Sequence, residues 1–289
     1  MFAALPLPYP FEREFMQLAL VTGLVVGACA PLIGTFLVQR RLSLLGDGIG
    51  HLAFAGVAGG LLIGIWPVWS ALAVSATGAL AVDRLRSRGR AQGDLALAIF
   101  FYGGIAAGVV LVSLAGSLDA NLLTYLFGTI LTVEPSEVWV VVALGAVILV
   151  AVGLGHRALF AMVVDEEWAR VAGLPVEALN ALLAVLTALT IVASMRIVGI
   201  LLVAALMVLP VASAQLLARS QRAVLVWASG LGMSSVVIGL AAARQWGLAP
   251  GGTIVLVAVG TFLVLSVVLT LFGRPAAKPA TTVPAMVDP

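Results

Sequence analysis

Residues 15–38 read FMQLALVTGLVVGACAPLIGTFLV, without one charged side chain. Crossing the roughly 30 Å hydrocarbon core of a bilayer takes about 20 apolar residues in a helix, so this run is long enough to span a membrane. The rest of the chain has the same character, because 62% of its 289 residues are hydrophobic and only 10% are charged. A soluble domain carries about 25% charged residues. The sequence therefore predicts an all-α, polytopic integral membrane protein.

Eight further apolar runs follow, each bounded by charged residues or by Gly and Pro. They predict spans at residues 43–64, 66–82, 95–115, 136–154, 178–194, 197–218, 223–243 and 253–272. We expect about eight or nine transmembrane helices in one domain at 15–272, after an extracytoplasmic N-terminus at 1–14. The tail at 273–289 is rich in Pro and Ala without apolar periodicity, so we expect it to be disordered and cytoplasmic.

The basic residues decide the orientation, provided that the segment 117–133, SLDANLLTYLFGTILTV, does not cross the membrane. One side then holds 12 of the 15 basic residues, namely Arg40, Arg41, Arg84, Arg86, Arg88, Arg90, Arg157, Arg170, Arg219, Arg222, Arg274 and Lys278. The other side holds Arg13, Arg196 and Arg244. Cytoplasmic loops carry the excess of Lys and Arg, so the first side is cytoplasmic. We expect 117–133 to be a surface or re-entrant helix on the outer side.

Several classes of protein are excluded. The arginines are scattered and only one lysine occurs, whereas nucleic-acid binding needs a clustered basic face. The single cysteine, Cys29, excludes an intrachain disulfide and a thiolate metal cluster within one chain. The motifs G-x-x-x-x-G-K-[ST], H-E-x-x-H and G-x-S-x-G are missing. We expect neither an enzyme nor a bound cofactor.

Two ionisable residues fall inside the second span, in SLLGDGIGHLAFAGVAGG. Asp47 and His51 are four residues apart, so they share one face of a helix and can bind one divalent transition metal such as zinc, manganese or iron. The alternative is a structural hydrogen bond between the two side chains. Two ligands leave the metal shell incomplete, and a partner copy in a symmetric dimer, water or other helices could complete it.

A second informative segment is DEEWARVAGLP, at residues 165–175 on the predicted cytoplasmic side. Asp165 can cap a short helix at about 165–173, Glu166 and Glu167 suit its first turn, and Arg170 lies in its last turn. Gly173 fits the position after the helix. Such a mixed-charge helix is suited to dock on a partner protein, and an ordinary connecting helix is the alternative.

Three stretches resemble the bacterial metal-ion ABC transporter permeases, the ABC-3 family of zinc, manganese and iron uptake. PLIGTFLVQRRLSLLGDGIGHLAFAGVAGG, residues 31–60, is similar to the region in which paired arginines precede a Gly-Asp-x-x-x-His helix. DEEWARVAGLP resembles the coupling region, and MRIVGILLVAALMVLPVASAQLLA, residues 195–218, resembles the late hydrophobic signature. Phe54 and Ala55 depart from the Leu-Pro that family members often carry.

The resemblance implies a homodimeric, multi-pass permease of the bacterial inner membrane, surrounded by lipid. Its implied partners are a separate cytoplasmic ATPase and an extracytoplasmic solute-binding protein, and its cargo is a divalent metal. Asp47 and His51 match the positions thought to coordinate the ion, and the helix from Asp165 to Gly173 matches the ATPase contact. An ion-coupled secondary transporter and a membrane enzyme with Asp47 and His51 as acid and base are the alternatives.

Overall fold

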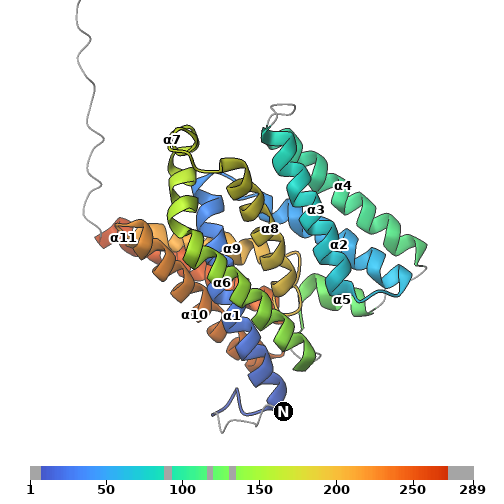
Figure 1. Cartoon of the computed structure of the whole chain (residues 1–289). Helices are drawn as coiled ribbons and strands as arrows, with labels where there is room; N and C mark the ends of the chain where they lie inside the picture. Colours follow the sequence, from blue (N-terminus) through green and yellow to red (C-terminus); the bar gives the residue numbers. More distant parts are fainter. Residues whose placement is uncertain (1–7, 88–92, 116–119, 130–134, 273–289) are drawn as a thin grey trace, which may run out of the picture.

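The computed structural model describes residues 8–87, 93–115, 120–129 and 135–272, and all regular structure in them is helical. The all-α prediction is therefore confirmed. The predicted disordered tail at 273–289 lies outside the described residues, as does the beginning of the predicted N-terminal segment 1–14. This part of the chain forms eleven helices, which are labelled in Figure 1. They are α1 (Glu14–Gln39), α2 (Leu45–Ile63), α3 (Pro67–Ser87), α4 (Gly93–Leu114), α5 (Ala120–Phe127), α6 (Pro135–Val164), α7 (Glu166–Val171), α8 (Val176–Ser194), α9 (Val203–Leu217), α10 (Gln221–Trp246) and α11 (Pro250–Phe272).

Seven of these helices are long and apolar enough to cross a membrane, namely α1, α2, α4, α6, α8, α10 and α11. The α9 helix is apolar but has only 15 residues, and α3 has 21 residues but ends in charged side chains. Each of the nine predicted spans overlaps one of these nine helices, of which seven are long and apolar enough to be candidate membrane spans. The eight residues of α5 are too few to cross a bilayer.

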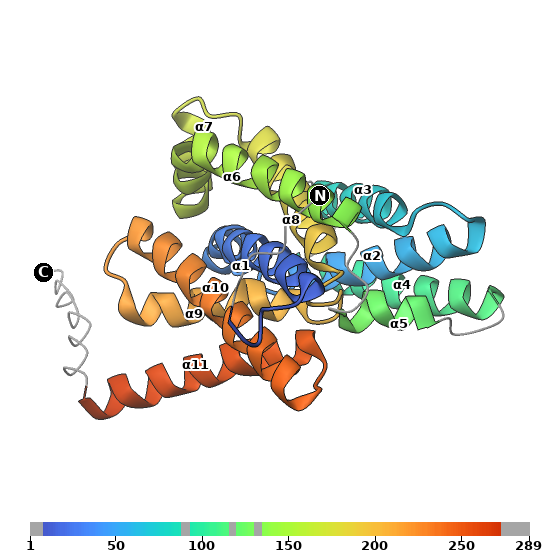
Figure 2. The same cartoon turned by 90° about the horizontal axis from the view of Figure 1, so that it is seen from below.

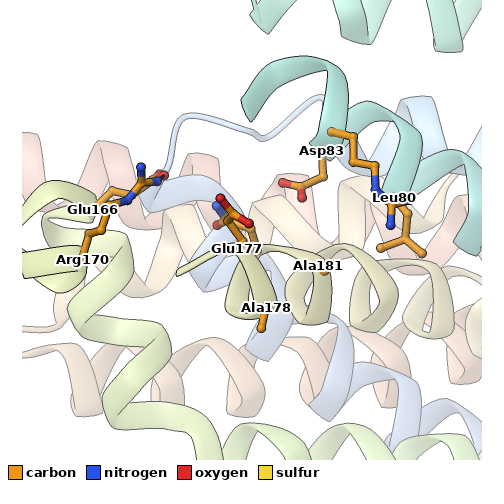
Figure 3. A pocket seen from close by; sticks show the side chains of 9 residues that line it. Leu80, Asp83, Glu166, Arg170, Glu177, Ala178 and Ala181 are labelled. Atoms are coloured by element: carbon orange, nitrogen blue, oxygen red, sulfur yellow. Dashed lines mark hydrogen bonds and ion pairs between the residues drawn. The ribbon is translucent and has the colours of Figure 1, made fainter. Parts of the chain in front are cut away.

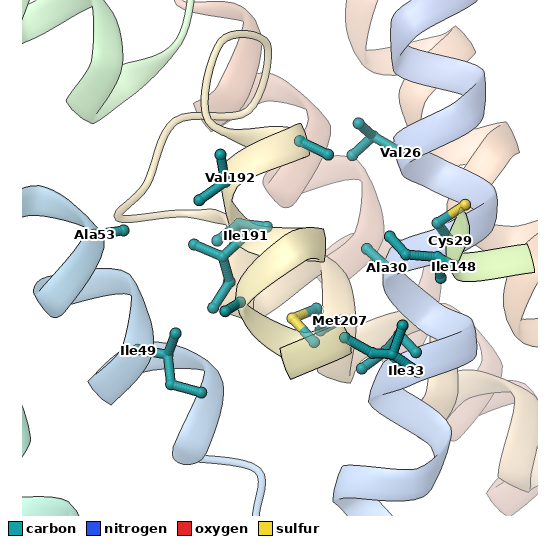
Figure 4. Packing of buried hydrophobic residues seen from close by; sticks show 14 of the residues in the cluster. Val26, Cys29, Ala30, Ile33, Ile49, Ala53, Ile148, Ile191, Val192 and Met207 are labelled. Atoms are coloured by element: carbon teal, nitrogen blue, oxygen red, sulfur yellow. The ribbon is translucent and has the colours of Figure 1, made fainter. Parts of the chain in front are cut away.

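The α1 helix lies at the centre of the bundle, as the view from below shows (Figure 2), and it packs against α6, α8, α9 and α10. Its side chains Val26, Ala30 and Ile33 are buried and face the neighbouring helices in Figure 4. Ile191 of α8 and Met207 of α9 belong to the same buried cluster. A helix with neighbours on several sides buries side chains all round, so its apolar pattern is continuous and not amphipathic.

The two ends of the bundle are held by different polar contacts. At one end, Arg40 after α1 contacts Glu166 of α7. At the other end, Arg196 contacts Glu137 at the start of α6, and Arg244 lies 5.4 Å from the ring of Phe15 in α1. Arg40 and Arg196 therefore lie at opposite ends of the bundle. The arginine distribution assigns these two residues to opposite sides of the membrane, so the two assignments agree.

Two predicted boundaries are wrong. The span expected at 136–154 continues as helix to Val164, the end of α6. The span expected at 197–218 begins as helix only at Val203, and residues 195–202 form successive turns. The backbone N–H of Ile200 donates to the Tyr125 carbonyl of α5, and that of Leu201 donates to Leu126. Gly199 has φ of 88° and passes so close to Leu126 that a Cβ atom there would overlap its carbonyl oxygen. The apolar run leaves the helical conformation because its backbone groups find partners in α5.

The approach of α1 to α9 depends on Gly34, because a Cβ atom there would overlap the carbonyl oxygen of Met207. A backbone atom cannot rotate away as a side chain does. We expect Gly34→Ala to destabilise the bundle by about 1–3 kcal/mol through overpacking, seen as a lower thermal midpoint in detergent. The matched control is Gly230→Ala in α10, where nothing lies within 4 Å of the added methyl group. Equal midpoints for the two variants would contradict this role of Gly34.

Candidate functional site

The first candidate site lies at the start of α2. Asp47 occupies the first turn of this helix, where the positive end of the helix dipole stabilises a carboxylate. His51 follows one turn later on the same face. Both residues are half-buried, while the intervening Gly48, Ile49 and Gly50 are buried. The two polar side chains therefore share the more accessible side of α2.

The α4 helix fixes the surroundings of this pair. A Cβ atom at Gly104 of α4 would lie 2.8 Å from the backbone carbon of His51, so only glycine allows so close an approach. The ring of Phe101 packs edge to face on the imidazole of His51, with 4.5 Å between the ring centroids. Aromatic contacts of this geometry hold a ring in one orientation. His51 is thus in contact with α4 through both its backbone and its ring.

Asp47 and His51 lie close enough to interact electrostatically with each other, but neither forms a hydrogen bond or ion pair with a residue in the described part of the chain. No hydrogen bond or ion pair joins them, so the structural hydrogen bond considered as the alternative is not formed. Nor does any group of three or more His, Cys, Asp or Glu side chains gather among residues 8–87, 93–115, 120–129 and 135–272 in a way that could hold a metal. If the pair holds a metal, the described residues offer it two ligands, and a complete shell would need ligands from elsewhere.

The second candidate site is α7, at the end of the bundle that carries Arg40. The Asp165 carboxylate accepts a hydrogen bond of 2.9 Å from the Trp168 backbone N–H, as the N-cap prediction requires. At the other end, the N–H of Leu174 donates to the Ala169 carbonyl and that of Gly173 donates to the Arg170 carbonyl. Gly173 has φ of 82°. These two bonds form a Schellman motif, so the helix is closed by its own sequence.

Glu166 and Glu167 have different surroundings, which the sequence did not separate. Glu166 accepts from Arg40 and lies 3.5 Å from Arg170, whereas Glu167 is exposed. The guanidinium of Arg40 also donates to the side chain of Asn180 in α8, which is 7% exposed. Arg40 therefore joins α1, α7 and α8. The paired arginines before the second span marked this position in the sequence. The sequence did not show that Arg40, and not Arg41, makes the contacts with α7 and α8.

The outward side of α7 is apolar and uncovered. Trp168 is 61% exposed and Val171 is 88% exposed. Large apolar side chains on a charged surface segment mark a site for a partner. The helix is thus anchored to the bundle through Glu166 and presents Trp168, Val171 and Glu167 on its other side.

A cavity of about 520 Å³ lies beside α7, between α3 and α8. Figure 3 shows the carboxylates of Asp83, Glu166 and Glu177 around it, with Arg170 on the α7 side. Asp83 follows the apolar part of α3, which ends near residue 82. Burial raises the pKa of the Asp83 carboxyl, and the neighbouring Arg40 acts in the opposite direction. This end of the bundle therefore holds a polar, charged recess directly behind the exposed face of α7.

Known proteins resemble the chain over most of its length. Residues 12–269 match the model of the ABC 3 transport family. The manganese transport system membrane protein MntC of Listeria monocytogenes is 33% identical over 88% of this chain and 90% of that protein. The manganese import system permease protein ScaB of Streptococcus gordonii is 31% identical over 88% of this chain and 91% of its own length. The solved structure of PsaBC from Streptococcus pneumoniae in complex with Fab has a TM-score of 0.80 at 31% identity, covering 90% of this chain and 96% of that chain.

The role of Arg40 in holding α7 can be tested by its replacement. Arg40→Gln removes the charge that pairs with Glu166, so we expect amide hydrogens of residues 166–171 to exchange about tenfold faster, which corresponds to roughly 1.4 kcal/mol. The matched control is Arg41→Gln, because Arg41 is adjacent and exposed. The same exchange in both variants, measured by mass spectrometry on the purified chain, would show that Arg40 does not anchor α7.

Proposed function

The chain belongs to the ABC 3 transport family. We propose that it imports a divalent transition metal across the bacterial inner membrane and that this metal is manganese. It is a multi-pass metal ABC transporter permease and not an enzyme. Manganese is favoured over zinc and iron because both MntC and ScaB are named for it. The family also disfavours the two alternatives, the ion-coupled secondary transporter and the membrane enzyme.

The observation that carries this proposal is the pair of Asp47 and His51, which forms no hydrogen bond or ion pair in the described part of the chain. A carboxylate and an imidazole in a mostly apolar bundle are costly, so their retention on an accessible side of α2 favours a ligand that uses both. Carboxylate oxygen suits manganese, and imidazole suits most divalent transition metals. The pair therefore provides one hard and one borderline donor on one helical face.

The incomplete shell favours a homodimer. Two copies related by a twofold axis would offer two carboxylates and two imidazoles to one ion, and the same patch would meet itself across the axis. Four such donors hold the ion, while open positions filled by water let it leave. A transport site needs this balance, because an ion bound by a closed shell would not be released.

The place of the pair along the path supports import. Asp47 is in the first turn of α2, shortly after Arg40 and Arg41, so it lies toward the end that the arginine count assigns to the cytoplasm. An ion delivered from the outer side by a solute-binding protein would reach this pair late in its passage. Alternating access would then expose Asp47 and His51 to one side at a time.

The energy would come from a separate ATPase subunit that contacts α7. Trp168 and Val171 form its exposed apolar face, and Glu166 connects the helix to α1 through Arg40. A displacement of α7 by the ATPase would therefore be transmitted through Glu166 and Arg40 to α1, which packs against four other helices. The contact residues that we propose are those of the predicted helix, Asp165, Glu166, Glu167, Arg170 and Gly173, together with Trp168.

The role of the metal pair is tested by amide and alanine replacements. Asp47→Asn and His51→Ala each remove one donor, so we expect uptake of radioactive manganese into cells to fall at least tenfold. Glu12→Gln, an acid-to-amide change at an exposed position near the start of α1, is the control. The ATPase should still co-purify with all three variants. Full manganese uptake by the Asp47 and His51 variants would refute their role.

The docking role of α7 is tested at its outward face. Trp168→Ala should weaken the affinity for the ATPase by on the order of tenfold, because exposed tryptophans that become buried at interfaces contribute most of the binding energy. Trp246→Ala is the matched control, since Trp246 is 70% exposed at the end of α10. Affinity is measured by titrating the purified ATPase onto the permease in detergent. Unchanged affinity in Trp168→Ala would make α7 an ordinary connecting helix.

A further inference from the structure

A second cavity, of about 480 Å³, lies at the same end of the bundle as α7 but on another side. Its walls come from α1, from α6 and from the beginning of α10. The lining residues are Phe36, His156, Arg157, Phe160, Ser220, Gln221, Arg222 and Leu225. Arg157 and Arg222 belong to the predicted cytoplasmic group of arginines. The cavity therefore lies where the spanning segments of α6 and α10 reach the cytoplasmic side of the bilayer.

One wall of this cavity offers hydrogen-bond donors and positive charge. Arg157 and Arg222 are exposed and form no ion pair with any residue that the structure describes, and no acidic side chain lines the cavity. The side chain of Gln221 is engaged with the protein, because its oxygen accepts from the side-chain nitrogen of Gln39 and its own nitrogen is buried. Ser220 caps α10, a helix of 26 residues whose positive dipole end lies at this wall. A ligand that fits this wall must be an anion with acceptor oxygens.

The other wall is apolar. Phe160 and Leu225 line it together with Phe36, whose side chain is buried at the base. A water-soluble anion would leave these side chains uncovered, whereas a molecule with an anionic head and a hydrocarbon chain would cover both walls. Such a molecule is abundant at this depth of a membrane, because the inner leaflet presents anionic phospholipid headgroups beside its acyl chains. Basic pockets between transmembrane helices on the cytoplasmic side bind such headgroups.

We propose that this cavity binds one anionic phospholipid of the cytoplasmic leaflet. The phosphate contacts Arg157 and Arg222, and the upper part of an acyl chain lies against Phe160 and Leu225. The site is separate from the proposed metal pair and from the exposed face of α7, so it does not depend on the proposed transport function.

The experiment uses the full permease together with its ATPase in vesicles of phosphatidylcholine that contain a photoactivatable phosphatidylglycerol with the reactive group on its acyl chain. After illumination, labelled peptides are identified by mass spectrometry. We expect labels in α6 near Phe160 and in α10 near Leu225. The double variant Arg157→Gln/Arg222→Gln should reduce this labelling about tenfold or more, because each basic residue near the surface contributes to anionic lipid binding.

A matched control and a cavity-filling variant distinguish lipid binding in the cavity from general attraction of anionic lipid to surface arginines. Arg41→Gln/Arg219→Gln removes the same charge from the same side outside the cavity lining, so labelling should stay within about twofold of the original. Leu225→Trp fills the apolar wall and should reduce labelling without any change in charge. Equal loss in both double variants, or labels elsewhere on the chain, would overturn the proposal.

Competing occupants give distinct results. If photoactivatable phosphatidylcholine labels the same peptides as strongly, the site is not selective for anionic lipid. If glycerol phosphate in solution abolishes the labelling, the ligand is a soluble anion. If the peptides are labelled only after the ATPase is removed, the cavity belongs to a protein contact. Each of these three results would overturn the proposal, and selective labelling of the complete assembly would support it.

Discussion

A polar group inside a membrane must find its partner within the protein, because hydrocarbon offers neither donors nor acceptors. In this permease the helices satisfy most backbone groups internally, local turns satisfy others, and in one region a distant segment supplies the partner. That region is the turns at residues 195–202, since Ile200 and Leu201 donate to carbonyls of α5. The short α5 and the interrupted start of α9 therefore depend on each other.

The same constraint places the charged side chains. Arg196 contacts Glu137 and lies 4.8 Å from the ring centre of Tyr125, so a guanidinium near one end of the bundle has both an ionic and an aromatic partner. Arg40 has Glu166 and Asn180 at the opposite end. With these charges paired, Asp47 and His51 stand apart as polar groups of a spanning helix without a hydrogen bond or ion pair in the described chain. That contrast makes them the candidates for the cargo. The unpaired arginines at the cytoplasmic boundary, Arg157 and Arg222, suit the lipid headgroup for the same reason.

Much of the fold could be predicted from residue type and spacing. The positions of nine apolar helices, the cap of α7 at Asp165 and the positive φ of Gly173 follow from local sequence, because helix length, capping and chain reversal are decided over a few neighbouring residues. The grouping of Asp47 with His51 also follows from the sequence, since residues four apart share a helical face. It could not assign Glu166 and Glu167 to different sides of α7. That difference depends on Arg40, which lies 126 residues away along the chain.

By itself, then, the sequence determined that this chain is an all-helical membrane protein, and its resemblance to the ABC-3 permeases implied the transport role. The arginine distribution predicts which side faces the cytoplasm, and the spacing of Asp47 and His51 predicts that they share one helical face. These predictions depend on composition, periodicity, charge and motif, which need no knowledge of contacts. Only the tertiary structure decided that the apolar run after Met195 is not helical until Val203, that Arg40 joins three helices, and that an apolar and basic cavity opens between α6 and α10. The physical reason is that each of these features is a contact between segments far apart in the chain, and such contacts are chosen by packing of the whole bundle.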